Sequence, residues 1–217
     1  MKWSEEAWNA AEPTYKKILE QPFIQGLING TLDKEKFIFY IQQDALYLVE
    51  YGKVLTGIAS RLSKPEHIED FIHFAGDSMA VEKELHKTFV SKIPFSGKPE
   101  PSPACLLYTS FLLRQLANAP VEVILAAVLP CFWIYREVGN YILEHQTKGE
   151  NPYQDWINTY GGEEFDNSVN LAISICDELA AKCTPEQRQE MTNAYMMCSK
   201  MEWIFWDSAW HLEKWPV

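Results

Sequence analysis

Residues 126–139 read AAVLPCFWIYREVG, and this stretch decides the fold class. Apolar side chains recur in it every three or four positions, which is the period of a helix with one buried face. Pro130 lies in the middle of this pattern, directly before Cys131. A proline inside a helix removes one backbone hydrogen bond and crowds the carbonyl four residues earlier, here that of Ala126. We therefore predict a kinked helix whose local unwinding opens the Cys131 thiol to a ligand.

The same helical period continues along almost the whole chain, and caps and breakers divide it into separate helices. Ser4 and Ser102 are predicted to cap their helices with their hydroxyl groups. The stretch PFSGKPEPSP at 94–103 is the one clear loop. The predicted helices cover approximately residues 4–19, 22–30, 31–61, 65–92, 103–119, 120–145, 151–160, 163–182 and 184–211. The sequence thus predicts a single all-α domain over residues 1–217, with about eight helices and no strand or interdomain linker.

Composition and charge exclude several classes of partner. The chain has 217 residues and a formal net charge of −11. Nucleic acids and anionic membranes both favour clustered Lys and Arg, so neither is an expected partner. No apolar run approaches the roughly 18 residues of a membrane span, and the N-terminal stretch has no continuous apolar segment of the kind found in signal peptides. A cytoplasmic protein is expected.

The cysteines indicate free thiols. Their number is odd, and no two of them have Cys-x-x-Cys spacing, so neither a disulfide framework nor a zinc knuckle is expected. Free cysteine is among the residues most often buried in a core, and four of the five are expected to be only that. The five are Cys105, Cys131, Cys176, Cys183 and Cys198.

Three predicted helices each carry one polar side chain where the buried stripe requires an apolar one. The interruptions are Asp44 in the stripe within 37–55, Cys131 in that within 124–142, and Glu202 in that within 191–209. A buried carboxylate needs a partner or becomes protonated, so a structural network of buried hydrogen bonds would explain either acid alone. A pocket lined by several helices would explain all three interruptions together.

Aromatic side chains follow each of these polar residues within one helical turn and therefore share its helix face. The pairs are Asp44 with Tyr47, Cys131 with Tyr135, and Glu202 with Phe205. A slot with aromatic walls and a few fixed polar groups suits a flat heteroaromatic ligand, although many of the aromatic residues must simply belong to the core. The spacing itself does not name the ligand.

A metal site is the main alternative, because helical bundles often hold two metal ions between Glu-x-x-His motifs on facing helices. Glu82 and His86 stand four residues apart, but no second matching pair appears in the sequence. The remaining histidines are scattered, and the chain has neither a glycine-rich phosphate loop nor a Gly-x-Ser-x-Gly motif. No metal ion and no organic cofactor are expected.

Six segments, in this order, carry a resemblance to a known family. They are QPFIQGLINGTL (21–32), YIQQDALYL (40–48), PSPACLLYTS (101–110), LPCFWIYREVG (129–139), TYGGEEF (159–165) and MEWIFWDSAW (201–210). With them the chain resembles, over nearly its whole length, the TenA family, which is the thiaminase II or aminopyrimidine aminohydrolase group. The resemblance implies a haem oxygenase-like all-α fold and a homotetramer.

The resemblance also implies roles for individual residues. The family's active-site cysteine falls on Cys131, its pyrimidine-anchoring aspartate on Asp44, and its catalytic glutamate on Glu202. Its pocket aromatics fall on Tyr47, Tyr108, Tyr135, Tyr160 and Phe205, of which Tyr108 and Tyr160 rest on the resemblance alone. The expected substrate is a 4-amino-2-methylpyrimidine whose methylene substituent is replaced by hydroxyl. Two alternatives are a non-catalytic pyrimidine or thiamin binder and a di-metal oxygenase of the same fold.

Overall fold

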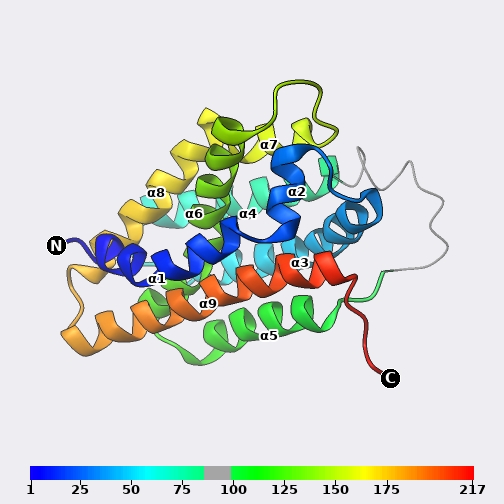
Figure 1. Ribbon diagram of the computed structural model, residues 1–217. Coiled ribbons are helices and arrows are strands. Elements are labelled where there is room, and N and C mark those ends of the chain that lie inside the picture. Colours follow the sequence, from blue (N-terminus) through cyan, green and yellow to red (C-terminus); the bar gives the residue numbers. More distant parts are fainter. Residues whose placement is uncertain (86–98) are drawn as a thin grey trace. The chain divides into compact units, whose positions relative to one another are not determined.

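The computed structural model describes residues 1–85 and 99–217, with the side chains of 81–85 left out. The described residues form nine helices and no strand, so the predicted all-α class is confirmed (Figure 1). The helices are α1 Trp3–Leu19, α2 Pro22–Asn29, α3 Lys34–Ala59, α4 Pro65–Leu85, α5 Pro103–Asn118, α6 Val121–His145, α7 Gln154–Tyr160, α8 Glu163–Ala180 and α9 Pro185–His211. The predicted extension of the fourth helix to residue 92, and residues 94–98 of the predicted loop, lie outside the described residues.

Two of the predicted helix ends form as their residues require. Ser102 accepts a hydrogen bond from the Cys105 backbone N–H at 3.2 Å, and Pro103 occupies the first position of α5, where its missing N–H costs nothing. Gly30 ends α2 with φ 65° and ψ 20°, the left-handed conformation that glycine adopts without steric cost.

The predicted cap at Ser4 is wrong. The helix α1 begins at Trp3, and Ser4 is a buried residue inside its first turn. Its backbone N–H and its hydroxyl donate, each at 2.8 Å, to the two carboxylate oxygens of Asp177 on α8. The hydroxyl therefore joins two helices rather than capping its own.

The helix α6 also differs from its prediction. It is continuous from Val121 to His145 with Pro130 inside it, so the local unwinding predicted beside Cys131 is wrong. Residues 123–130 of this helix, which include Pro130, are all buried. Packing of a long apolar helix can outweigh the roughly 3 kcal/mol that an interior proline costs.

The described chain divides into two compact units. Residues 1–33 and 122–207 form the first unit, and residues 34–121 and 208–217 form the second. In the first unit α1 packs against α2 and α8, and α7 packs against α8. Arg136 on α6 donates to Asp166 at 3.2 Å and to Asn170 at 2.8 Å, which ties α6 to α8.

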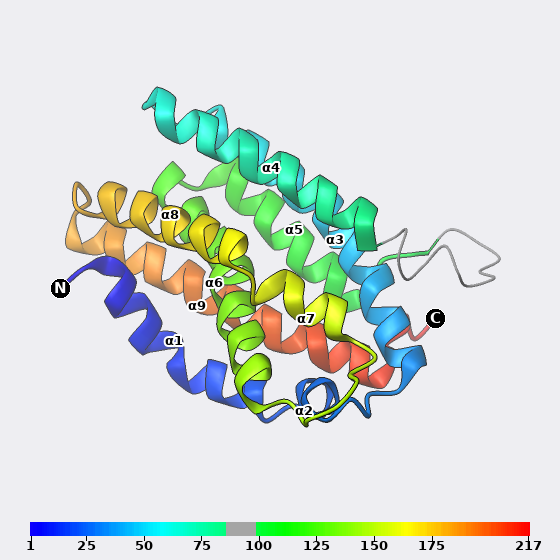
Figure 2. The same ribbon diagram turned by 90° about the horizontal axis from the view of Figure 1, so that it is seen from above.

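In the second unit α3 packs along both α4 and α5 (Figure 2). The approach of α5 to α3 is close at Gly57, where an added Cβ atom would lie 2.5 Å from a methyl carbon of Leu116. Arg61, after α3, donates to the backbone oxygens of Leu116 and Ala119 at the end of α5. These contacts fix α5 against α3. None of the described helices is long and apolar enough to cross a membrane.

Candidate active site

The three predicted stripes are buried, as the helical period required. Every member is at most 6% exposed except Cys131, which is partly exposed. Asp44 is 3% exposed and Glu202 2%, so two carboxyl groups do lie inside the molecule. The predicted aromatic residues are buried as well: Tyr47, Tyr108, Tyr135, Tyr160 and Phe205.

The second unit brings together three of the predicted site residues. Tyr47 on α3 and Tyr108 on α5 have ring centroids 4.9 Å apart, and Tyr51 stacks on Tyr47 at 5.4 Å. Asp44 lies one turn before Tyr47 on the same face of α3. A carboxyl group thus stands beside a cluster of tyrosine rings. Tyr108, known from the resemblance alone, belongs to that cluster.

The Asp44 carboxyl group is poorly solvated. Burial raises its pKa from 3.8 to about 7, because removal from water disfavours the charged form. Its Oδ2 atom receives no hydrogen bond from any described residue. A buried acceptor without a donor is costly, on the order of 1–3 kcal/mol. A ligand that donates hydrogen bonds or carries positive charge would remove that cost.

Cys105 lies near Asp44 but is not an active thiol. It is fully buried, and its Sγ donates to the backbone oxygen of Gln43 at 3.6 Å. Burial first, and the negative charge of Asp44 second, raise the pKa of this thiol to about 12. Because the thiolate is the nucleophile, we expect Cys105 to react slowly at neutral pH.

The first unit brings together a second aromatic cluster. Tyr135 on α6 has its ring centroid 5.0 Å from Tyr160 on α7 and 4.9 Å from Trp206 on α9. Trp156 packs on Tyr160 at 4.8 Å. Cys131 lies one turn before Tyr135 on the same face of α6. Tyr160, the second residue known only from the resemblance, is therefore part of the cluster that contains Tyr135.

Glu202 and Phe205 lie in the buried stripe of α9, and Trp206, next to Phe205, is buried as well. Trp206 is missing from the predicted site, although it lies one turn after Glu202 and packs on Tyr135. Its indole N–H finds no acceptor among the described residues. The signal that could have identified it is its spacing of four from Glu202, which places both on one face of α9.

Gly139 is a further residue that the sequence pattern does not identify. A Cβ atom added there would lie 2.8 Å from the carbonyl carbon of Tyr160 and 2.9 Å from its oxygen. Backbone atoms cannot give way as a flexible side chain can. The absence of a side chain at Gly139 therefore allows α7 to end against α6, with Tyr160 beside Tyr135.

We expect Gly139→Ala to displace Tyr160 and to lower the free energy of unfolding by about 1–3 kcal/mol, the usual cost of overpacking a core. Urea denaturation measures this change. Gly76→Ala is the matched control, because Gly76 is an exposed helical glycine with no atom within 4 Å of an added Cβ. The control should raise stability by up to about 1 kcal/mol. Equal effects of the two substitutions would show that the contact with Tyr160 is slack.

The burial of the cysteines separates them into two groups. Cys105, Cys176 and Cys198 are buried, whereas Cys131 and Cys183 are partly exposed. The expectation that all four cysteines other than Cys131 are buried is therefore wrong for Cys183, which lies in the turn between α8 and α9. Burial and the nearby Glu122 raise the pKa of the Cys183 thiol, and Arg188 opposes them.

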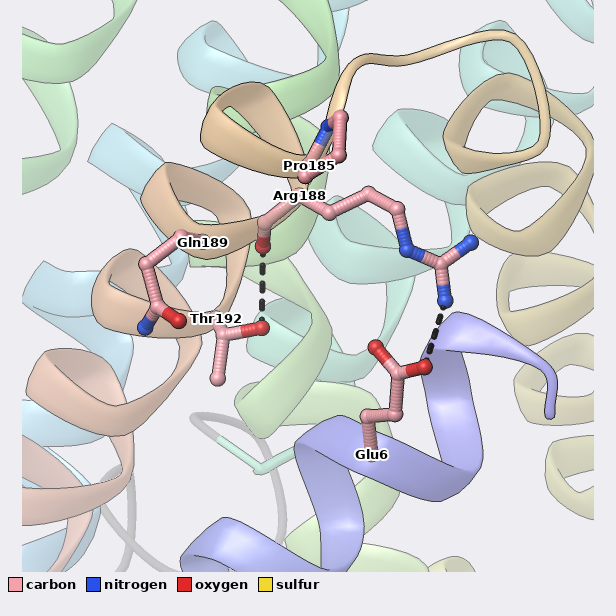
Figure 3. Close-up of a pocket in the computed structure, with 5 residues that line it drawn as sticks. All are labelled: Glu6, Pro185, Arg188, Gln189 and Thr192. Carbon is pink, nitrogen blue, oxygen red and sulfur yellow. Dashed lines mark hydrogen bonds and ion pairs between the residues drawn. The ribbon is translucent and has the colours of Figure 1, made fainter.

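A surface hollow of about 270 Å³ lies in the first unit. None of the predicted site residues lines it. Glu6 of α1 and Arg188 of α9 line it and form an ion pair at 2.9 Å (Figure 3). Thr192 donates to the backbone oxygen of Arg188 at 2.9 Å and accepts from the indole of Trp3 at 3.1 Å. Glu6, Arg188 and Thr192 thus already have polar partners within the protein.

The described residues contain no group of three or more His, Cys, Asp or Glu side chains that could hold a metal ion. The pair Glu82 and His86, on which the di-metal alternative depends, lies outside the described side chains.

Comparison with known proteins agrees with both the fold and the motifs. The model of the TENA/THI-4/PQQC family matches residues 8–212. The chain is 35% identical over 219 residues to the aminopyrimidine aminohydrolase of Bacillus subtilis, covering 99% of this chain and 92% of that protein. It is 37% identical over 203 residues to the thiamine biosynthesis multifunctional protein ThiED of Corynebacterium efficiens. That match covers 93% of this chain but only 27% of the longer Corynebacterium protein.

Solved structures extend the comparison to the fold. A TenA homologue from Pyrococcus horikoshii superposes with a TM-score of 0.86 at 29% identity, covering 97% of this chain and 99% of that one. A Shewanella denitrificans domain with a haem oxygenase-like fold superposes with a TM-score of 0.77 at 14% identity, covering 98% and 93%. The resemblance drawn from the six sequence segments is confirmed, and the chain belongs to the TENA/THI-4/PQQC family with a haem oxygenase-like fold.

Proposed function

We propose that this chain is a hydrolase that replaces the substituent on the methylene of a 4-amino-2-methylpyrimidine with hydroxyl, in thiamin salvage. Two full-length relatives at 35% and 27% identity are aminopyrimidine aminohydrolases. The observation that carries the proposal is Asp44, a buried carboxyl group one helical turn from packed tyrosine rings, with an oxygen that no described residue donates to. An aminopyrimidine offers both the flat ring and the donors that this group lacks.

Asp44 has the role of anchoring the ring. A carboxylate can accept two parallel hydrogen bonds, one from a protonated ring nitrogen and one from the neighbouring amino group. Burial raises the pKa of Asp44 to about 7 and so disfavours its ionised form. A cation beside the carboxyl group favours the ionised form again. Binding of the protonated ring therefore both satisfies Asp44 and makes the ring more electrophilic.

Cys131 has the role of the nucleophile. Its thiolate forms a bond to a ring carbon, and the electron pair pushed into the ring then expels the substituent as the exocyclic bond breaks. Water adds to the exposed methylene, the carbon–sulfur bond breaks, and the aromatic ring is restored. The net change is one water consumed and one amine, or the thiazole of thiamin, released.

Glu202 has the role of moving protons. Departure of an amine requires a proton, which the protonated carboxyl group of Glu202 supplies, and the resulting carboxylate then takes a proton from the attacking water. Glu202 ends each cycle in the form in which it began. Its 2% exposure keeps bulk water from competing for these transfers. Tyr47, Tyr108, Tyr135, Tyr160 and Phe205 are proposed as the apolar walls around the ring.

The experiment that tests this function is a chromatographic assay for hydroxymethylpyrimidine, with aminomethylpyrimidine and thiamin as substrates in parallel incubations. Release of the product from either one supports the hydrolase. Binding of both without product would instead indicate a pyrimidine-binding protein. Loss of activity on chelation, restored by added metal, would favour the di-metal alternative, since the proposed mechanism needs no metal ion or organic cofactor.

We expect Asp44→Asn to weaken substrate binding and to stabilise the empty protein. The asparagine amide puts a donor where the ligand also donates, and such a mismatch costs on the order of 1–3 kcal/mol, or about 5- to 150-fold in affinity. Calorimetric titration with aminomethylpyrimidine measures the affinity. Unchanged affinity would show that Asp44 is a structural acid.

The stability of the same variant has a defined pH dependence. Between about pH 4, the pKa of an unfolded Asp, and about pH 7, the folded wild type binds the extra proton. Its free energy of unfolding should therefore fall as pH rises through this range, by at most about 4 kcal/mol, and level off above it. Asp44→Asn should lack this component. Urea denaturation of both proteins at several pH values measures the difference, which isolates Asp44 from the other titrating groups.

A cytoplasmic homotetramer is proposed from the family resemblance. Three leucines on the outer face of α5 are 38–49% exposed and supply apolar surface that could be buried between subunits: Leu106, Leu107 and Leu113. Light scattering of the purified protein measures the assembly state.

A further inference from the structure

The short segment before α5 is held by a glutamine next to Asp44. The side chain of Gln43 accepts a hydrogen bond from the Ser102 backbone N–H at 2.7 Å and donates to the Glu100 backbone oxygen at 3.1 Å. Gln43 is only 5% exposed, so these bonds form largely out of water. The amide thus pairs with both polar groups of an extended stretch of backbone and fastens it to α3.

Two residues after α9 also bind this segment and the first turn of α5, which follows it. A carboxylate oxygen of Glu213 accepts from the Ala104 backbone N–H at 2.9 Å, and the indole of Trp215 donates to the Pro101 backbone oxygen at 3.0 Å. Ala104 carries one of the first N–H groups of α5, which have no acceptor within the helix. A carboxylate at that end also interacts favourably with the helix dipole.

The residue that follows α9 adopts a costly conformation that directs Glu213 towards α5. Leu212 has φ 51°, and it is the one non-glycine residue with positive φ in the described chain. This conformation costs on the order of 1–2 kcal/mol for a residue with a side chain. It turns the chain so that the Glu213 N–H donates to the Ser208 oxygen at 2.9 Å. The contacts of Glu213 and Trp215 compensate for that cost.

These contacts determine where α5 begins, and therefore where Tyr108 lies. Cys105, in the first turn, donates through its backbone N–H to Ser102 and through its sulfur to Gln43. One turn later, Tyr108 packs on Tyr47 at 4.9 Å. A shift of the first turn of α5 along α3 would move the Tyr108 ring by the same amount relative to Tyr47.

We propose that Gln43, Glu213 and Trp215, here called the brace, are positioning residues that hold Tyr108 in the register required to bind the pyrimidine ring. This inference rests on the proposed function. The brace residues are assigned no contact with substrate. They act by fixing the N-terminal turn of α5 against α3 from two independent attachment points.

The test begins with Glu213→Ala, which removes the acceptor for the Ala104 N–H. We expect the KM for aminomethylpyrimidine to rise about tenfold, equivalent to 1.4 kcal/mol, with kcat changed less than about threefold. Glu213→Gln keeps an acceptor oxygen and should restore most of the affinity. Lys214→Ala is the matched control, because Lys214 is the exposed neighbour of Glu213 in the same segment, and its KM should equal that of the wild type.

A double-mutant cycle tests the link to Tyr108. If Glu213 acts through Tyr108, then Glu213→Ala should have little further effect on KM in a Tyr108→Ala background, since coupled residues are not additive. Additive effects of the two substitutions on KM, or an unchanged KM in Glu213→Ala alone, would overturn the proposal.

A second measurement does not depend on activity. Cys105 is fully buried in the first turn of α5, which the brace holds. Iodoacetamide followed by peptide mass mapping should therefore label it faster in Glu213→Ala and in Gln43→Ala than in the wild type or Lys214→Ala. Absence of turnover in the wild type would refute the proposed function, whereas this labelling would still report on the brace. Equal protection of Cys105 in all four proteins would refute the brace itself.

Discussion

Replacement of Cys131 by serine is expected to lower kcat for aminomethylpyrimidine by several orders of magnitude. A serine hydroxyl has nearly the same shape as the thiol but is a far weaker nucleophile at neutral pH. Cys131 is partly exposed, so the hydroxyl does not have to be buried without a partner. We therefore expect the melting temperature and the affinity for the pyrimidine to remain close to those of the wild type. Steady-state kinetics, calorimetric titration and thermal denaturation measure the three quantities.

Cys183→Ser is the matched control, because Cys183 is the other partly exposed thiol of the described chain. It lies in the turn before α9, and its sulfur donates to the Leu179 oxygen at 3.4 Å. We expect full activity from this variant. Near-normal activity of Cys131→Ser, together with loss of activity in another Cys→Ser variant, would show that the nucleophile has been assigned to the wrong residue.

Limited alkylation gives an independent reading of the same assignment. Both Cys131 and Cys183 should be labelled in the folded protein, while the buried Cys105, Cys176 and Cys198 should react slowly. A bound pyrimidine should protect Cys131 and leave Cys183 unchanged. Exposure alone does not distinguish these two thiols, so peptide mass mapping is done with and without the ligand.

The positions of the helices and of the three polar interruptions could be predicted from the sequence, because both depend on local periodicity. A residue placed every three or four positions on a long helix returns to the same face whatever the rest of the chain does. Asp44 and Glu202 are therefore predicted to be buried acids from the sequence alone, and their exposures of 3% and 2% confirm it.

Features that depend on a distant partner could not be predicted in the same way. Ser4 has the residue type of an N-cap, but its hydroxyl bonds to Asp177, which is 173 positions away. Gly139 has no local signal in the middle of α6, since its importance comes from the backbone of Tyr160. Gln43 likewise pairs with a segment about 57 to 59 positions away. Local rules describe what a residue can do, and the tertiary fold determines which partner it meets.

Cys131 illustrates a prediction that was right for exposure but wrong for its cause. The thiol is partly exposed although α6 is continuous through Pro130. The other members of its stripe are almost fully buried, with exposures of at most 3%. The accessibility of the thiol therefore comes from its place on the helix surface and not from unwinding.

Glu202→Gln is expected to have the second largest effect, a loss of about 10²- to 10⁴-fold in kcat with aminomethylpyrimidine, the range typical of a removed general acid–base. The amide has the size of the carboxyl group but cannot transfer a proton. Glu190→Gln is the matched control on the same helix, because Glu190 is exposed and should tolerate the change. Thermal denaturation of both variants measures whether their folds are retained.

The two substrates then separate the two proton transfers assigned to Glu202. An amine must be protonated to depart, whereas the thiazole of thiamin is cationic before cleavage and leaves as a neutral molecule without a proton. Glu202→Gln should therefore slow aminomethylpyrimidine hydrolysis more than thiamin cleavage, because only the first reaction loses both the acid and the base step. Equal losses with the two substrates would restrict Glu202 to activation of the attacking water, which both reactions share. An unchanged kcat with both would show that Glu202 is a buried structural acid whose proton takes no part in the reaction.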